Sequence, residues 1–305
     1  MKTTTKLLMT AGTAAALAAG YYGVCELSYH QYIRRKDRKP DENTTSDERK
    51  EEVQQWYKTC HITDVNMLSF DELNLHAMMI ENHKSDQWVI LVHGYGGEGM
   101  DMLYRAMRFD KLGYNCLLID LRGHGLSDGE YIGMGWNDRL DILKWCDWLV
   151  EQKPDAGIIL YGISMGASAV MMACGEEELN PHVLCAIEDS GYTSVAEISA
   201  YQLKQKMNLA AQPVMIGLGT LVRNRCHYNV WEASAVEQLK KCRVPMMFIH
   251  GEEDDFVPYD MVFENYYACI TEKELYTVSD AGHCQADHSP HYMERIDRFI
   301  RRFSK

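Results

Sequence analysis

The sequence of 305 residues lacks an excess of basic charge. It contains 31 lysine and arginine residues against 44 aspartate and glutamate residues, which gives a formal net charge of −13 at pH 7. A protein that binds nucleic acid needs a basic face for the phosphates. The charge balance therefore argues against a nucleic-acid partner.

The ten cysteines lack the spacing of a metal site or of a disulfide framework. No C-x-x-C pair occurs, and several thiols lie in apolar runs such as "YNCLLID" and "HVLCAIED". A free thiol in such a run behaves as a small buried hydrophobic group. The pattern favours unpaired cysteines in a reducing setting, and we expect no zinc or other metal site.

Internal repeats and the phosphate-binding pattern G-x-x-x-x-G-K-[ST] are also missing. The glycine-rich stretch "VILVHGYGGEG" at 89–99 is therefore not predicted to be a phosphate loop of that kind. We expect no cofactor.

Residues 1–33 are predicted to be a membrane anchor or a signal segment. The run from Leu7 to Val24 carries no charge, and its length is close to the minimum for a spanning helix. The favoured interpretation is an uncleaved single span, with the basic cluster at 34–39 holding the downstream domain on the cytoplasmic side. The two lysines before the run favour the opposite orientation. The alternative is a signal peptide, because 16–18 read A-x-A, and the protein would then be secreted after cleavage.

A charged segment over 34–54 follows and is predicted to be a solvated linker, because it has no apolar periodicity. Over 55–305, apolar runs of strand length alternate with amphipathic stretches of helix length. This alternation predicts an α/β domain, with a mostly parallel sheet, helices on both faces and ligands at the carboxyl ends of the strands. The expected strands are 61–68, 73–80, 87–92, 114–120, 156–162, 182–189, 244–250 and 273–278.

One connection, about 191–241, contains no core strand and is rich in methionine, leucine and valine. We interpret it as a helical cap whose apolar underside covers a pocket. The alternative is a two-helix excursion that packs on the domain surface.

The stretch "LYGISMGASA" places Ser164 between a predicted strand and a predicted helix. The glycines at 162 and 166 leave room for a strained serine backbone and for close packing of helix on strand. Such a turn exposes a serine hydroxyl at the carboxyl end of the strand, next to a helix N-terminus. Ser164 is therefore a candidate nucleophile.

A serine nucleophile needs a base and an acid that orients the base. Asp254 follows the strand at 244–250 and is the preferred acid, with Asp255 in reserve and Asp189 as a more distant rival. His283 follows the last strand and is the preferred base. Two later histidines, at 288 and 291, lie where a C-terminal helix is expected to begin, so we interpret them as surface or capping groups.

Acyl transfer also needs N–H donors for the oxyanion. The expected donors are the backbone N–H groups of Met165, directly after the nucleophile, and of Tyr95 in the early glycine-rich loop. In "LIDLRGHGLSDG", Arg122 is predicted to tie loops together through its guanidinium group, and His124 is given no catalytic part.

The order of "HGYGG", "DLRGHGLS", "GISMGA", "HGEEDDFVP" and "AGH" resembles the α/β-hydrolase superfamily over about 59–303. The sequence is most similar to bacterial membrane-tethered serine hydrolases related to monoglyceride lipases and to serine-aminopeptidase-like esterases. The resemblance implies an eight-stranded sheet with an antiparallel second strand and a helical cap between strands six and seven. It also places the acid of the pattern H-G-x-x-D-x-x-V-P on Asp254.

The predicted activity is a serine hydrolase that acts on carboxylic esters of small to medium acyl groups, with a small-molecule ester as substrate. Cleavage of peptides, amides or thioesters by the same residues, and a non-catalytic binding protein, are the alternatives. The sequence indicates neither the physiological substrate nor the oligomeric state.

Overall fold

The computed structural model describes residues 2–35, 47–207 and 211–304, and within them the strands form one eight-stranded sheet. Its order is β1-β2-β4-β3-β5-β6-β7-β8. Strand β2 is antiparallel to both of its neighbours, and the other neighbouring strands are parallel. The strands are β1 (Ile62–Leu68), β2 (Asn74–Ile80), β3 (Gln87–Val92), β4 (Asn115–Ile119), β5 (Gly157–Ile163), β6 (Val183–Asp189), β7 (Met246–Gly251) and β8 (Lys273–Val278). The predicted sheet is confirmed, and each expected strand begins and ends within two residues of an observed one.

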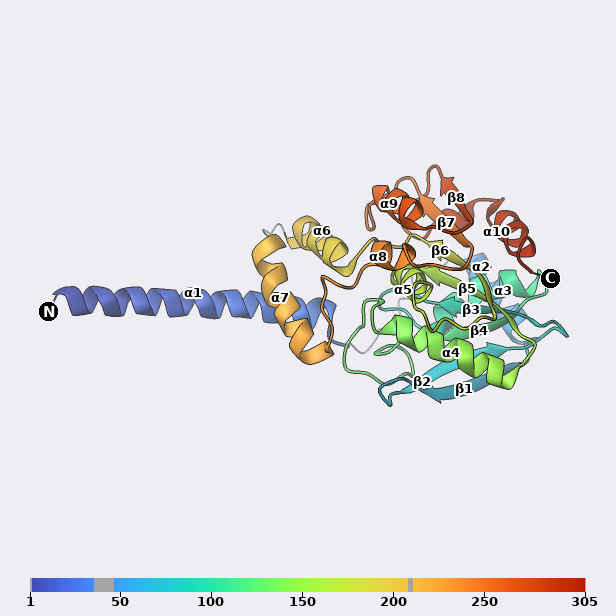
Figure 1. Cartoon of the computed structure of the whole chain (residues 1–305), viewed down its shortest axis with the longest axis horizontal. Coiled ribbons are helices and arrows are strands. Elements are labelled where there is room, and N and C mark those ends of the chain that lie inside the picture. Colours follow the sequence, from blue (N-terminus) through green and yellow to red (C-terminus); the bar gives the residue numbers. More distant parts are fainter. Residues whose placement is uncertain (1, 36–46, 208–210, 305) are drawn as a thin grey trace.

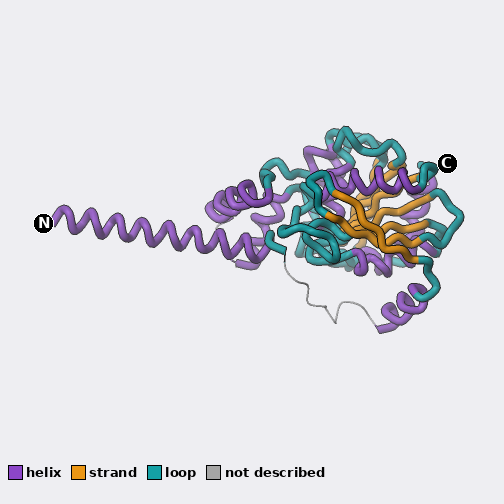
Figure 2. Tube along the Cα trace, turned by 90° about the horizontal axis from the view of Figure 1, so that it is seen from below, coloured by secondary structure: helices purple, strands orange, loops and turns teal. Residues whose placement is uncertain are grey.

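Helices cover both faces of this sheet, whose strands run through the interior of the body (Figure 2). Side chains alternate along each strand: in β3, Trp88, Ile90 and Val92 join one hydrophobic cluster, whereas Val89 and Leu91 join the other. The first cluster includes buried residues of α4 (Asp138–Gln152), α5 (Met165–Ala173), α8 (Ala235–Leu239) and α9 (Asp260–Ala268). The second includes α3 (Leu103–Asp110) and α10 (Tyr292–Arg301), with α2 (Asp47–Tyr57) partly buried against it. Two short 3₁₀ helices, η1 (Gly99–Met102) and η2 (Ala286–His288), complete the second layer.

The connection between β6 and β7 carries helices α6 (Val195–Met207), α7 (Ala211–Cys226) and α8. This is the position at which the resemblance implies a helical cap. In Figure 1, α6 and α7 lie together at the side of the body from which the N-terminal helix projects.

The N-terminal helix α1 spans Lys2–Tyr32 and crosses α7 near its own C-terminal end (Figure 1). No helix in the described part of the chain is long and apolar enough to cross a membrane. The predicted span over 7–24 is therefore not supported. Alanine, glycine and threonine make up most of that run, and the residues that most favour insertion, such as leucine and valine, are few in it.

The segment predicted as a solvated linker, 34–54, is ordered at both described ends. Arg34 forms a bridge with Tyr131, and the guanidinium group of Arg35 donates to the carbonyls of Ser127 at 2.7 Å and Gly125 at 3.0 Å. At the other end the chain forms α2, and residues 36–46 lie outside the described residues. The charge pattern of the segment could not predict these contacts, because they depend on backbone groups about ninety residues away in the sequence.

Candidate active site

Ser164 lies in the turn between β5 and α5, at the carboxyl end of the sheet. Its backbone has φ 53° and ψ −119°, a conformation that L-residues rarely adopt. Helix α5 begins directly after Ser164, and its first turn packs closely against β3. This close packing requires glycine at 166, because a Cβ there would lie 2.3 Å from the Val92 carbonyl oxygen. The strained turn and the glycine together hold the serine hydroxyl at the sheet edge.

Three side chains from three loops form a continuous chain of hydrogen bonds at this edge. His283 Nε2 lies 2.8 Å from Ser164 Oγ, and His283 Nδ1 lies 2.7 Å from Asp254 Oδ2. Because a carboxylate only accepts, Nδ1 carries the proton, which leaves Nε2 to accept from the serine hydroxyl. The structure therefore brings together the three residues that the sequence indicates as nucleophile, base and acid.

The Asp254 carboxylate is surrounded by donors. Its Oδ1 accepts from the N–H groups of Phe256 and Val257, both at 2.9 Å, and its Oδ2 lies 3.2 Å from His250 Nε2. Burial raises the pKa of this carboxyl, but the hydrogen bonds from His250 and His283 outweigh it and hold the pKa well below its usual range. Asp254 is thus kept ionised.

The other acidic and histidine candidates lie elsewhere. Asp255 is exposed, and Asp189 is fully buried with its carboxylate accepting from Tyr292 and Ser190 rather than from His283. The histidines at 288 and 291 are exposed and pair with the acidic groups at 287 and 294. Both observations agree with the choice of His283 and Asp254 over their rivals.

Two supporting residues were not indicated by the sequence. His250 is fully buried, and its Nε2 faces the carbonyl of Val257 at 3.1 Å as well as Asp254. Arg105 on α3 donates to the carbonyl of Cys284 at 3.3 Å and so anchors the loop that carries the base. His250 had a weak signal, four residues before the acid in "FIHGEEDD". Arg105 had none, because the loop residue that it contacts lies 179 residues away in the sequence.

The loop with the predicted oxyanion donor packs directly against Ser164. A Cβ on Gly94 would lie 3.3 Å from Ser164 Cβ, so Tyr95 follows a point of close approach. The loop is held by His124, whose Nε2 accepts the Gly96 N–H at 3.2 Å. Burial lowers the pKa of His124 to about 3, which keeps this ring neutral and able to accept. Met165, the other expected donor, is the first residue of α5.

The buried guanidinium group of Arg122 forms bidentate ion pairs with two carboxylates. Its guanidinium group donates to both carboxylate oxygens of Asp141, at 2.7 and 2.8 Å, and to both of Asp71, at 3.0 Å each. The group therefore ties α4 to the turn between β1 and β2, in agreement with the structural role that the sequence indicates.

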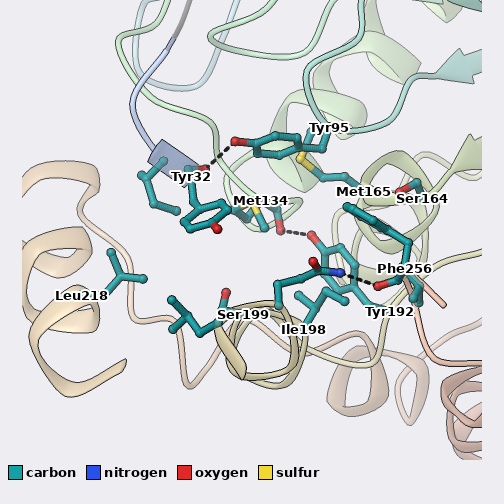
Figure 3. Close-up of a pocket in the computed structure, with 14 residues that line it drawn as sticks. Tyr32, Tyr95, Met134, Ser164, Met165, Tyr192, Ile198, Ser199, Leu218 and Phe256 are labelled. Atoms are coloured by element: carbon teal, nitrogen blue, oxygen red, sulfur yellow. Dashed lines mark hydrogen bonds between the residues drawn. The ribbon is translucent and has the colours of Figure 1, made fainter. Parts of the chain in front are cut away.

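An apolar pocket opens beside Ser164 and runs under the cap helices (Figure 3). Its space, mouth included, is about 710 Å³. No charged side chain is among the fourteen residues that line it: Tyr32, Ile33, Tyr95, Met134, Ser164, Met165, Tyr192, Ile198, Ser199, Gln202, Leu203, Leu218, Phe256 and Val257.

Known proteins share this architecture. A family model described as serine aminopeptidase, S33, matches residues 83–188, about a third of the chain. The esterase Pf2001 of Pyrococcus furiosus superimposes with a TM-score of 0.68 at 22% identity, covering 90% of this chain and 100% of that one. This chain has the α/β-hydrolase fold.

Two sequence relatives match about two thirds of this chain. The protein YqkD of Bacillus subtilis is 26% identical over 205 residues, which cover 67% of each chain. Lysophosphatidylserine lipase ABHD12 of Rattus norvegicus is 22% identical over 213 residues, which cover 68% of this chain and half of the lipase. The relatives whose printed names state an activity are thus hydrolases.

The described residues of this chain include no group of three histidine, cysteine, aspartate or glutamate side chains placed to hold a metal ion. Ser164, His283 and Asp254 are joined by the chain of hydrogen bonds described above. The chemistry that this arrangement supports is proton transfer between a hydroxyl and an imidazole.

Proposed function

We propose that this protein is a serine hydrolase that cleaves small to medium carboxylic esters by two-step acyl transfer. The observation that carries the proposal is the hydrogen-bonded chain from Asp254 through His283 to Ser164, at the mouth of an apolar pocket. A hydroxyl bonded to the free nitrogen of an oriented imidazole is the arrangement that nucleophilic catalysis requires.

In the first step, His283 Nε2 takes the proton of Ser164 as Oγ attacks the ester carbonyl. Asp254, which is ionised, stabilises the imidazolium that forms and keeps Nδ1 protonated. The backbone N–H groups of Tyr95 and Met165 donate to the oxyanion, a contribution of about 10²–10³ in rate for each such donor. His283 then protonates the leaving alcohol.

In the second step, a water molecule replaces the alcohol and gives its proton to His283. The oxygen of that water bonds to the acyl carbon, and the new oxyanion accepts from the same two N–H groups. The acyl–Oγ bond then breaks and His283 returns the proton to Ser164 Oγ, which releases the carboxylic acid and restores the serine. Both steps use residues of this chain alone.

An ester is favoured over a peptide by the uncharged pocket. Recognition of a free α-amino group needs a carboxylate close to the substrate, and none of the described residues that line this pocket is acidic. The family model's description keeps an aminopeptidase as the second candidate. A peptidase would need an amine anchor outside the lining residues.

The test is covalent labelling with a fluorophosphonate probe. The wild type is expected to label, Ser164→Ala is expected to lose labelling, and Ser279→Ala, which removes an exposed serine hydroxyl, is the control. Equal labelling of Ser164→Ala and wild type would refute the assignment of the nucleophile.

A series of p-nitrophenyl esters from acetate to palmitate, measured beside an aminoacyl p-nitroanilide, separates the two candidate activities. The proposal requires a higher kcat/KM on at least one ester than on the anilide. The reverse order would favour the peptidase.

A further inference from the structure

The N-terminal helix contributes to the pocket that holds Ser164. The last residue of α1, Tyr32, and the next residue, Ile33, are among the lining residues, and Ile33 is only 2% exposed. Figure 3 shows Tyr32 on the side of the pocket that faces Leu218 of α7. A segment that the sequence indicates as an anchor therefore reaches the candidate active site.

Hydrogen bonds fix this end of α1 to the catalytic domain. The hydroxyl of Tyr95 donates to the carbonyls of Gln31, at 3.3 Å, and Tyr32, at 3.2 Å. The Ile132 N–H donates to the carbonyl of Ile33 at 2.7 Å. These bonds satisfy carbonyls that a helix end leaves without partners, and two of the three come from Tyr95, in the loop of the expected oxyanion donor.

A second set of contacts fixes α1 to the cap. Glu26 and Arg225 form a two-bonded ion pair at 2.6 and 2.9 Å. Cys25 packs against the bare backbone of Gly217, where a Cβ would lie 2.2 Å from its sulfur. Leu218, the next residue of α7, lines the pocket. The helix thus joins the cap to the catalytic domain on both sides of the pocket.

We propose that Tyr32 and Ile33, at the C-terminal end of α1, form one wall of the acyl-binding pocket and limit the length of acyl chain that Ser164 accepts. The inference rests on the proposed function, since it concerns the acyl group that the serine receives. Ile33 is the residue whose size sets that limit, because it is buried, apolar and held by its backbone at a fixed place in the wall.

The size of the expected effect follows from pocket energetics. A single methylene that a hydrophobic pocket gains or loses changes kcat/KM by about 10–200-fold. Tryptophan at position 33 has a larger side chain than isoleucine, so the wall would extend further into the pocket and should exclude several methylenes of a long acyl chain. A short acyl group, which ends before the wall, should be unaffected.

The experiment measures kcat/KM for p-nitrophenyl esters from acetate to palmitate in the full-length chain and in two variants. Ile33→Trp is expected to lower kcat/KM for the decanoate at least about tenfold relative to the acetate. Ile33→Ala is expected to shift the preferred chain to a longer one. Leu27→Ala is the matched control, because Leu27 lies on the same helix but is 68% exposed.

The proposal is overturned if both folded variants keep the wild-type chain-length profile, or if Leu27→Ala changes it as much as they do. Ile33→Ala decides the question if the tryptophan variant fails to fold. Fluorophosphonate labelling of wild type separates this failure from that of the proposed function. If wild type labels and the variants keep its chain-length profile, only the proposed role of α1 is refuted. If wild type does not label, the proposed serine mechanism is refuted as well.

Discussion

Replacement of Asp254 by asparagine tests the hydrogen-bonded chain that ends at Ser164. Every partner of the Asp254 carboxylate is a donor: two backbone N–H groups on Oδ1, and His250 and His283 on Oδ2. An amide of the same shape keeps only one acceptor atom. One pair of donors must therefore face its NH₂ group.

The structure determines which pair that is. The backbone N–H groups at 256 and 257 cannot change, so the amide oxygen takes the place of Oδ1, and the NH₂ group faces the histidines. His283 Nδ1 must then accept, which places the ring's proton on Nε2, where it blocks proton transfer from Ser164. His250 keeps an acceptor, because its Nε2 also faces the carbonyl of Val257.

We expect Asp254→Asn to lower kcat for ester hydrolysis about 10⁴-fold, which is about 5.5 kcal/mol in activation free energy, with little change in thermal stability. The assay is steady-state hydrolysis of a p-nitrophenyl ester together with a thermal unfolding curve. Asp255→Asn makes the same chemical change at an exposed neighbour and should stay within about twofold of wild type. A folded Asp254→Asn enzyme with more than about a tenth of the wild-type kcat would refute the tautomer argument.

Two further predictions concern histidines that do not contact Ser164. Because His124 is buried, its folded-state pKa of about 3 lies below the unfolded value of about 6.5, so the unfolded state binds the proton first. The free energy of unfolding from urea titrations should therefore fall as the pH drops from about 6.5 toward 3, and His124→Asn should flatten that fall; an equally steep fall in the variant would contradict the assignment. His250→Phe removes a donor from Asp254 and should lower kcat about tenfold at constant KM, whereas an unchanged kcat would show that His250 does not support the acid.

The local pattern predicted most of the fold because its signals are short-range. The eight apolar runs and the helix expected to begin after Ser164 depend on neighbouring residues, and each matches an observed element. Glycines also carried information: Gly166 leaves the room that the turn at Ser164 needs. The order of the motifs was enough to indicate Ser164, Asp254 and His283 as a set.

The N-terminal segment shows where local pattern reading was insufficient. Its uncharged run suggested a membrane span, which the described helices do not support. The same segment ends in Tyr32 and Ile33, which line the pocket. Nothing near them in the sequence indicates this, because their hydrogen-bond partners Tyr95 and Ile132 lie about 60 and 100 residues further along the chain.

The sequence by itself therefore determined the strands, the order along the chain of the loops that carry the candidate residues, and the candidates for nucleophile, base and acid. These features depend on residue type and local spacing. Only the tertiary structure decided how they meet. It set the 2.7 and 2.8 Å contacts of His283, the four donors around Asp254 and the position of α1 against the cap. Contacts between distant segments depend on how the whole chain packs, and no short stretch of residues specifies them.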